Sequence, residues 1–398
     1  MLNTQFSPWP SFTQEEADAT SRVLLSNKVN YWTGQEGREF EKEFAKFSEA
    51  KYAVAVANGT LALDLALVAL NVGARNGGSV DDEVVVTSRT FLASVSSIII
   101  AGATPIFAEV DFNSQNVCAE TIQSVITGKT KAIIAVHLAG MPCEMDDIMT
   151  LANEFDLVVI EDCAQAHGAK YKGKPVGSIG HIGTWSFCQD KIMTTGGEGG
   201  MVTTNDESLW KKMWSYKDHG KSWDSIYNKE HPPGFRWLHE SFGTNWRLTE
   251  MQAAIGRIQL QRMPAWFEKR NNHAAKIEFV LAQLDLIRLI DVPDYIEHAQ
   301  YKYYAFIKPE LLAAGWSRDR IVDEINALGV PCYQGSCSEV YLEKAFDKTE
   351  YRPKTYLKIA RELGETSLML LVHPTLTIDE MQKTCSVLEQ VLTKAGKN

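Results

Sequence analysis

The chain has 398 residues, of which 45% are hydrophobic and 23% are charged, and its formal net charge is −10 at pH 7. These values are typical of a soluble globular protein with room for two domains, and they exclude an intrinsically disordered chain. An acidic chain lacks the basic surface that phosphate-backbone binding requires, so nucleic acid is not an expected partner.

The N-terminus and the cysteines indicate the cytoplasm. The opening MLNTQFSPWPSFTQEE lacks the basic and then apolar run of a signal peptide. The longest apolar stretch, around residues 95–103, is too short to cross a bilayer, so we expect no membrane partner. Seven cysteines show neither a CxxC pair nor a regular spacing, which predicts reduced thiols in a soluble, cytoplasmic protein.

From about residue 50, short runs rich in Val, Ile and Ala alternate with helical patterns. The predicted strands are 52–57, 83–87, 104–110, 131–137 and 157–160. The predicted helices between them are 61–70, 92–101 and 145–155. Strands that are almost continuously apolar are buried on both faces, so we predict an α/β fold with a mostly parallel sheet covered by helices.

This alternation ends after about residue 262. A long helical stretch at 265–284 is predicted to connect two domains. Beyond it, the pattern predicts a smaller α+β domain with a Tyr-rich strand and two helices, at 301–307, 318–328 and 378–392. We therefore predict an N-terminal arm and large domain at 1–264, and a linking helix with a small C-terminal domain at 265–398.

Ligands of an open α/β sheet lie beyond the carboxyl ends of its strands, and polar residues follow several of the predicted strands. Asn58-Gly59-Thr60 begins a helix directly after the strand at 52–57. The free N–H groups of a helix start, together with a glycine that admits close approach, suit a phosphate. A plain helix cap explains the same residues.

Glu161 and Asp162 close the strand at 157–160, and a carboxylate at a buried strand end needs a partner. No histidine or cysteine cluster with metal-ligand spacing accompanies them, so we expect a cationic organic group and no metal. His167, a lone histidine in the following turn, is interpreted as structural.

Lys191 lies in a polar turn between an apolar run at 183–187 and the glycine-rich segment 196–200. Phe91 follows the strand at 83–87 and can lie over a flat ring, although a place in the core explains it equally well. Together with the helix start and Asp162, these parts predict a site for pyridoxal 5′-phosphate, with its aldehyde bound to Lys191 as a Schiff base. A dinucleotide would require a GxGxxG motif, which ANGTLAL lacks.

Six segments carry a family resemblance: ANGTLALDLAL (57–67), EVVVTSRTFLAS (83–94), HLAGMPCEMDDI (137–148), EDCAQAHGAKYKGKPVGSIGHIGTWSF (161–187), the segment around Lys191, and FGTNWRLTEMQAAIGRIQL (242–260). In this order they resemble the DegT/DnrJ/EryC1/StrS family of sugar aminotransferases, which depend on pyridoxal phosphate and have fold type I. The resemblance covers essentially the whole chain.

The resemblance implies a role for each matching residue. Lys191 would be the catalytic lysine, Asp162 would pair with the pyridine nitrogen, and Gln165 would bind the phenolic oxygen. The remaining cofactor contacts would be the backbone of Gly59, Thr60 and Leu61 and the hydroxyl of Ser186 at the phosphate, and the ring of Phe91.

Three further residues are implied to act on the phosphate or the substrates. Asn245 matches an asparagine that reaches the phosphate from a second subunit, which implies a homodimer with shared active sites. Arg247 and His219 would contact the small-molecule substrates, with Arg247 suited to an anion.

A lysine at position 191, where some family members have histidine and dehydrate sugars, favours transamination. The expected reaction moves the amino group of L-glutamate to a keto-sugar for a bacterial-type surface polysaccharide such as lipopolysaccharide. Because segments 223–242 and 329–346 depart from the common pattern, the acceptor is either a nucleotide-linked keto-deoxysugar or an 8-keto octulosonic acid that gives 8-amino-Kdo.

Two alternatives to a transaminase remain open at the level of sequence. One is a regulatory protein that binds pyridoxal phosphate without turnover. The other is a pyridoxal-phosphate lyase or desulfurase, which would need a mobile catalytic cysteine such as Cys332 or Cys337.

Overall fold

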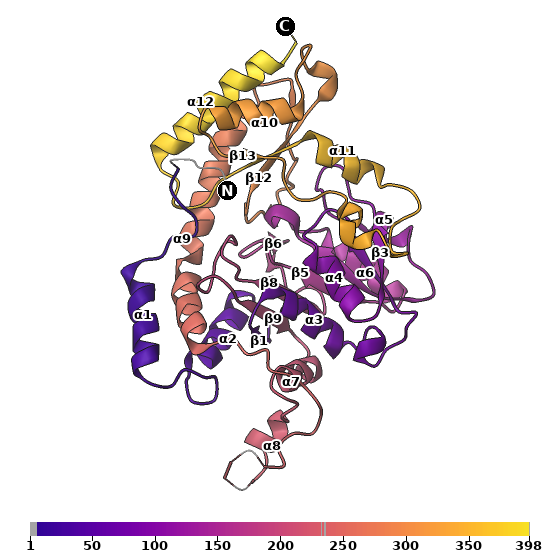
Figure 1. Cartoon of the computed structure of the whole chain (residues 1–398), viewed down its shortest axis with the longest axis vertical. Helices are drawn as coiled ribbons and strands as arrows, with labels where there is room; N and C mark the ends of the chain where they lie inside the picture. Colours follow the sequence, from indigo (N-terminus) through magenta and orange to yellow (C-terminus); the bar gives the residue numbers. More distant parts are fainter. Residues whose placement is uncertain (1–5, 232, 235, 398) are drawn as a thin grey trace.

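A computed structural model of the chain describes residues 6–231, 233, 234 and 236–397. Figure 1 shows a larger α/β body and a smaller body above it. The long helix α9 (Glu250–Leu281) runs along one side and extends from the larger body into the smaller one. Helix α1 (Gln14–Leu25) packs beside α9.

The large body is built on a seven-stranded sheet in the order β1-β9-β8-β5-β4-β2-β3. Its strands are β1 (Tyr52–Val56), β2 (Glu83–Thr87), β3 (Thr104–Ala108), β4 (Thr130–Val136), β5 (Val158–Asp162), β8 (Ile182–Ser186) and β9 (Gly200–Thr204). The five strands from β8 to β3 are parallel, whereas β9 is antiparallel to both β1 and β8. The predicted mostly parallel sheet is therefore confirmed.

Helices cover both faces of this sheet. They are α2 (Glu36–Phe47), α3 (Gly59–Ala69), α4 (Ala93–Ile100), α5 (Ala119–Gln123), α6 (Met145–Glu154) and α7 (Glu207–Tyr216), while α8 (Trp223–Tyr227) lies at the lower end of Figure 1. Alternate residues of one strand enter different cores: Val84 and Val86 pack in one hydrophobic cluster and Val85 in another. This two-sided burial is why the strands are almost continuously apolar.

The smaller body has a four-stranded antiparallel sheet in the order β10-β12-β14-β13. Its strands are β10 (Ile287–Arg288), β12 (Tyr303–Ile307), β13 (Cys332–Tyr333) and β14 (Ser367–Leu370). Helices α10 (Arg318–Ala327), α11 (Lys358–Thr366) and α12 (Ile378–Ala395) accompany it. A third, three-stranded sheet joins β11 (Ile296–Glu297) to β6 (Lys170–Tyr171) and β7 (Lys174–Pro175).

Helix α9 begins earlier than the sequence analysis predicted. The prediction at 265–284 missed the residues before Pro264, which lies inside the helix although it lacks the N–H group for an internal hydrogen bond. A capping box marks the true start, because the backbone N–H of Thr249 donates to the side chain of Gln252 at 3.1 Å. The predicted domain boundary at 264/265 falls within α9 and stays a prediction.

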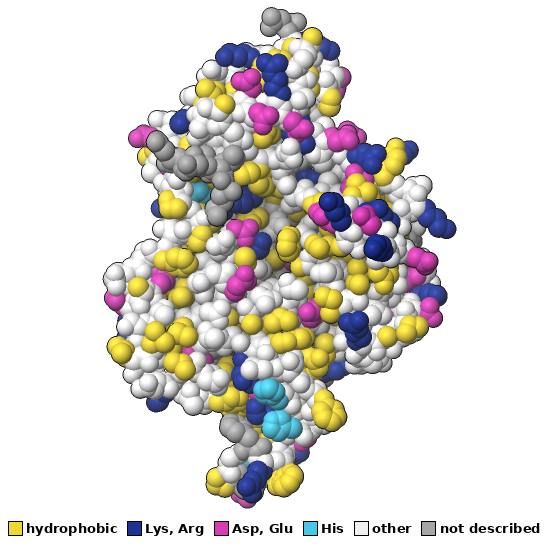
Figure 2. Space-filling view, in the orientation of Figure 1, with side chains coloured by type: hydrophobic (Ala, Val, Ile, Leu, Met, Phe, Trp, Pro, Cys, Tyr) yellow, Lys and Arg dark blue, Asp and Glu magenta, His cyan; other side chains and the backbone are white. Residues whose placement is uncertain are grey.

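The surface charges and the apolar character of the helices bear on the expected absence of nucleic-acid and membrane partners. In Figure 2, lysine and arginine side chains are interspersed with aspartate and glutamate over the visible face. Within the described ranges, the helices do not combine the length and apolar character that crossing a membrane would demand.

Gly256 generates a prediction about the packing of α9. A Cβ atom at this position would lie 2.6 Å from Cζ of Phe40 and 2.9 Å from Cγ2 of Thr195. An alanine normally stabilises a helix by about 1 kcal/mol relative to glycine. We expect the overlap to outweigh this gain, so Gly256→Ala should lower the free energy of unfolding by about 1–3 kcal/mol in chemical denaturation. A stabilised variant would contradict this packing.

Candidate active site

A cavity of about 650 Å³ lies where β5 and β8 end and α3 begins. Eight of the predicted site residues line it, together with Asn58: Gly59, Thr60, Leu61, Phe91, Asp162, Gln165, Ser186 and Lys191. The structure therefore brings together residues that are far apart in the sequence, some selected because they follow a strand and the others implied by the family resemblance. Asn245, Arg247 and His219 are absent from this lining among the described residues.

The start of α3 forms one wall of the cavity. The side chain of Asn58 accepts a hydrogen bond from the N–H of Leu61 at 2.9 Å, which leaves the N–H groups of Gly59 and Thr60 as first-turn donors for an anion. A Cβ atom on Gly59 would lie 2.6 Å from Cβ of Ser186, so glycine allows the helix start to approach that side chain. Backbone donors, a hydroxyl and a helix start fit a phosphate group.

Strand β5 ends in two carboxylates that lie in different surroundings. Glu161 is fully buried and accepts hydrogen bonds from the ring of His137 at 3.0 Å and from the N–H groups of Gly177, Ile179 and Gly180. The sequence analysis did not detect the neighbouring group of His137, Glu161 and Cys163, whose potential ligand atoms lie within 4.8 Å of one another. Because the carboxylate already has four protein donors, the group fits a structural role better than metal binding.

Asp162 is also buried but faces the cavity. Its carboxylate accepts hydrogen bonds from the Ser94 hydroxyl at 2.7 Å and from the N–H of Ala164 at 3.1 Å. Burial raises the pKa of Asp162, and these two donors and the nearby Lys191 offset that rise only in part. A carboxylate with incomplete compensation suits a cationic partner such as a protonated pyridine nitrogen.

Gln165 is oriented by the backbone. Its side-chain oxygen accepts a hydrogen bond from the N–H of Ala139 at 2.8 Å, which leaves the amide NH₂ group to donate. That donor fits a phenolic oxygen. Phe91 also lines the cavity and is 70% exposed, so an open aromatic face is available there rather than a core contact.

Lys191 reaches the cavity from the loop between β8 and β9. Its ammonium nitrogen lies 3.5 Å from the Asp190 carboxylate and 5.4 Å from the ring centroid of Tyr301. The Tyr301 hydroxyl donates to Asp190 at 2.5 Å. Burial alone would raise the pKa of Asp190, but Lys191 and this hydrogen bond outweigh burial and lower it. Asp190 is therefore an anion that holds the lysine beside the cavity.

The other three predicted residues lie together on a different segment. Asn245 pairs with Asp218 in an isolated antiparallel bridge, and the N–H of His219 donates to the Thr244 carbonyl at 2.9 Å. Arg247 donates to the buried Asp218 carboxylate at 2.5 Å, while its Nε atom is buried without a hydrogen-bond partner in the described structure. Their predicted roles stay predictions, because this segment does not line the cavity of its own chain.

Sequence reasoning missed four residues that shape the site: Ser94, Asp190, Tyr301 and Trp9. Ser94 lies in the first turn of α4, the helix that follows the strand at 83–87, and Asp190 directly precedes the lysine, so both had a positional signal. Tyr301 and Trp9 had none, because both lie far from Lys191 in the sequence and reach it only through tertiary contacts.

The cysteines that a desulfurase would need lie elsewhere. Cys332 is buried in β13, and burial raises the pKa of its thiol to about 12. Burial also raises the pKa of Cys337. Neither lines the cavity, and a thiol with a raised pKa is a poor source of the nucleophilic thiolate.

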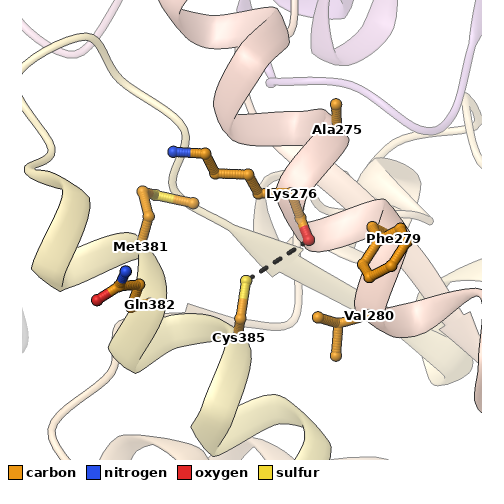
Figure 3. A pocket seen from close by; sticks show the side chains of 7 residues that line it. All are labelled: Ala275, Lys276, Phe279, Val280, Met381, Gln382 and Cys385. Carbon is orange, nitrogen blue, oxygen red and sulfur yellow. Dashed lines mark hydrogen bonds between the residues drawn. The ribbon is translucent and has the colours of Figure 1, made fainter.

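A second hollow lies between α9 and α12 (Figure 3). In Figure 3 the Cys385 thiol donates to the Lys276 carbonyl, at 3.5 Å, and the Lys276 ammonium points away from it. The other side chains drawn there are mainly apolar, so no set of polar groups converges on a ligand.

Comparisons with known proteins show what the whole chain is similar to. A model of the DegT/DnrJ/EryC1/StrS aminotransferase family matches residues 10–389. GDP-perosamine synthase of Caulobacter vibrioides is 36% identical over 368 residues, which cover 91% of this chain and 92% of that protein. The UDP-N-acetyl-3-dehydro-alpha-D-glucosamine 3-aminotransferase of Acidithiobacillus ferrooxidans is 34% identical, with 98% and 96% covered. The crystal structure of an aminotransferase from Psychrobacter cryohalolentis is 60% identical, with a TM-score of 0.95 and with 98% and 99% covered.

The raised pKa of Asp162 generates a prediction about stability. At pH values above the ordinary pKa of an aspartate, the Asp162 carboxyl ionises more readily in the unfolded chain than in the folded, cofactor-free protein. Ionisation therefore lowers the free energy of unfolding. Asp162→Asn should therefore be at least as stable as the parent at pH 7 without cofactor. The difference should shrink toward pH ~4, where the carboxyl becomes protonated in both states.

Chemical denaturation at several pH values would measure this effect, and binding of pyridoxal phosphate to the same variant should be weaker. Asp206→Asn is the matched control, because hydrogen bonds with Ser208 lower the pKa of that helix-capping carboxylate, and we expect no gain there. An Asp162→Asn protein that is less stable than the parent at pH 7 would be inconsistent with the raised pKa.

Proposed function

The chain belongs to the DegT/DnrJ/EryC1/StrS aminotransferase family and is a sugar aminotransferase that depends on pyridoxal phosphate, and we propose that it transfers the amino group of L-glutamate to a nucleotide-linked keto-sugar. The observation that carries the residue assignments is the convergence of Lys191, Asp162, Gln165 and the start of α3 on one cavity. Each of these groups matches a different part of the cofactor.

The proposed roles follow from the position of each residue. Pyridoxal phosphate supplies a ring that withdraws electrons from the donor's α-carbon. Lys191 would hold the cofactor through its aldehyde, and its amino group would carry the proton of that α-carbon. Asp162 keeps the pyridine nitrogen protonated, and Gln165 donates to the phenolic oxygen. The N–H groups of Gly59 and Thr60 hold the phosphate, with the hydroxyl of Ser186.

The relatives support a nucleotide-linked acceptor. The names of the Caulobacter and Acidithiobacillus proteins refer to a GDP-linked and a UDP-linked sugar, respectively. Synthesis of an amino sugar for a bacterial-type surface polysaccharide is the corresponding pathway class. An 8-keto octulosonic acid, which would give 8-amino-Kdo, is the rival acceptor that the test below separates. A cytoplasmic location completes the proposal, and the seven free cysteines support a reducing compartment.

A homodimer with shared active sites is part of the proposal. Asn245 and Arg247 do not line the cavity of their own chain, yet Arg247 has a buried donor atom without a partner within the described ranges. Two large aromatic side chains on the preceding segment are exposed, Trp237 at 87% and Phe242 at 99%. A second copy of the chain would cover such apolar surface and bring Asn245 to the phosphate of its neighbour.

Subunit exchange tests the shared sites. Lys191→Ala should lose the absorbance of the bound cofactor and nearly all turnover, and Asn245→Asp should be inactive because its charge repels the phosphate. After exchange of the two variants under mild denaturant, activity should return to about a quarter of the parent value, since half of the dimers are hybrids with one intact site. Two inactive variants that stay inactive as verified hybrids would contradict the shared site.

The acceptor is tested by competition. The absorbance of the bound cofactor should fall when a UDP- or GDP-linked amino sugar is added, because the reaction runs in reverse. We expect a nucleoside diphosphate to compete with that amino sugar and a simple sugar acid to have no effect. Competition by the sugar acid alone would replace this proposal with the octulosonic acid, and bleaching by glutamate in the same apparatus checks the donor.

A further inference from the structure

The N-terminal strap, defined as residues 6–10, is fastened to the small domain. The backbone N–H and the hydroxyl of Ser7 donate to the Glu380 carboxylate of α12 at 2.5 and 2.9 Å. The Thr375 hydroxyl donates to the carbonyl of Pro8 at 2.8 Å. Up to Pro8, the strap therefore follows the small domain rather than the sheet of the large domain.

The side chain of Trp9 links the strap to the loop that contains Lys191. Its ring contacts the edge of Trp266 with centroids 5.1 Å apart and stacks on His373 at 6.0 Å. The Arg270 guanidinium lies 5.1 Å from the centroid of the same ring. From this position the indole N–H donates to the backbone carbonyl of Lys191 at 2.8 Å.

This hydrogen bond adds to others that hold the loop, since the N–H of Lys191 donates to the Cys188 carbonyl at 3.0 Å and the N–H of Thr194 donates to the Gln259 side chain at 2.8 Å. The segment after Lys191 contains Gly196 and Gly197, which have φ angles of 89° and 126°. Fixing the carbonyl of Lys191 fixes the adjoining peptide plane, and with it the direction in which the lysine side chain leaves the backbone. A simple packing role for Trp9 would need the ring but not the N–H group.

Arg270 contacts both Trp9 and Tyr301, the two aromatic residues that lie near Lys191. Its Nε and Nη2 atoms are buried without hydrogen-bond partners in the described structure, so the ring of Trp9 is an important neighbour of this cation. Its Nη1 atom donates to the carbonyl of Tyr301 at 3.3 Å. Since the Tyr301 hydroxyl holds Asp190 and Asp190 faces the lysine, the backbone carbonyl and the ammonium group of Lys191 both connect to the contacts around Arg270.

We propose that Trp9 is a positioning residue for Lys191, which couples the position of the small domain to the orientation of the catalytic lysine through its indole N–H. This inference rests on the role of Lys191 in the proposed function. It predicts that the N–H group, separately from the ring, sets the reactivity of the lysine toward the cofactor.

The test compares Trp9→Phe with the matched control Trp266→Phe. Trp9→Phe keeps an aromatic ring against His373 and removes only the donor to Lys191. We expect kcat to fall roughly fivefold to tenfold, the rate equivalent of one hydrogen bond, with KM for glutamate within about twofold of the parent value. The pH at which the absorbance of the bound cofactor changes should shift as well, which reports on the lysine without turnover.

Trp266→Phe changes the other ring of the same contact, which has no bond to Lys191, and should leave that pH midpoint unchanged. An unchanged midpoint and kcat in Trp9→Phe would overturn the inference, and so would equal changes in both variants. If Trp9→Phe does not fold, Thr375→Val decides instead, because it removes the hydrogen bonds of the Thr375 hydroxyl to the Pro8 carbonyl and to the His373 ring that stacks on Trp9, and it leaves Trp9 itself unchanged. A shifted midpoint there supports the coupling, and an unchanged midpoint overturns it.

The outcome is separable from the proposed function. The absorbance measurements and the half-reaction with glutamate require no acceptor, so a wrong acceptor leaves this test intact. If Lys191→Ala retains the cofactor absorbance, the proposed function itself fails. If Lys191→Ala loses it while Trp9→Phe behaves as the parent, only the role of Trp9 fails.

Discussion

The site depends on the burial of two adjacent carboxylates at the end of β5. Successive residues of a strand point to opposite faces, so Glu161 and Asp162 enter different surroundings. Glu161 receives four protein hydrogen bonds and fixes the loop that leads to β8. Asp162 receives two, and its raised pKa reflects the remaining cost of burying its charge. One carboxylate thus stabilises the scaffold, while the other remains available to a cation in the cavity.

The sequence predicted much of this site because parallel strands bring their carboxyl ends to one edge. Asn58, Asp162 and Lys191 each follow a predicted strand, and the fold places all three around one cavity. Local sequence patterns predicted the helices less well where tertiary packing overrides the preferences of single residues. Helix α9 continues through Pro264, although proline is the residue that most disfavours a helix. The prediction therefore omitted the part of the helix before Pro264, even though the capping box at Thr249 marks its start.

No sequence pattern predicts the other parts of the site, because their positions depend on contacts between segments that are distant in the sequence. Trp9 and Tyr301 are separated from Lys191 by more than a hundred residues and carry no motif that refers to it. Asn245 and Arg247 were selected by resemblance alone, and a single chain leaves them outside its own cavity. In the proposed dimer they would act on the site of a second chain, and neither periodicity nor spacing encodes the geometry of that chain.

The same arrangement limits where substrate specificity can arise. The cavity walls formed by α3, β5 and the Lys191 loop are occupied by groups that match the cofactor, so they do not discriminate between keto-sugars. In the proposed dimer, discrimination would come from other surfaces, such as the segment of the second chain that holds the exposed Trp237 and Phe242. Because that segment precedes Asn245, the proposed dimer would complete cofactor binding and acceptor recognition with one interface. A change in this segment could therefore alter the acceptor without disturbing the chemistry at Lys191.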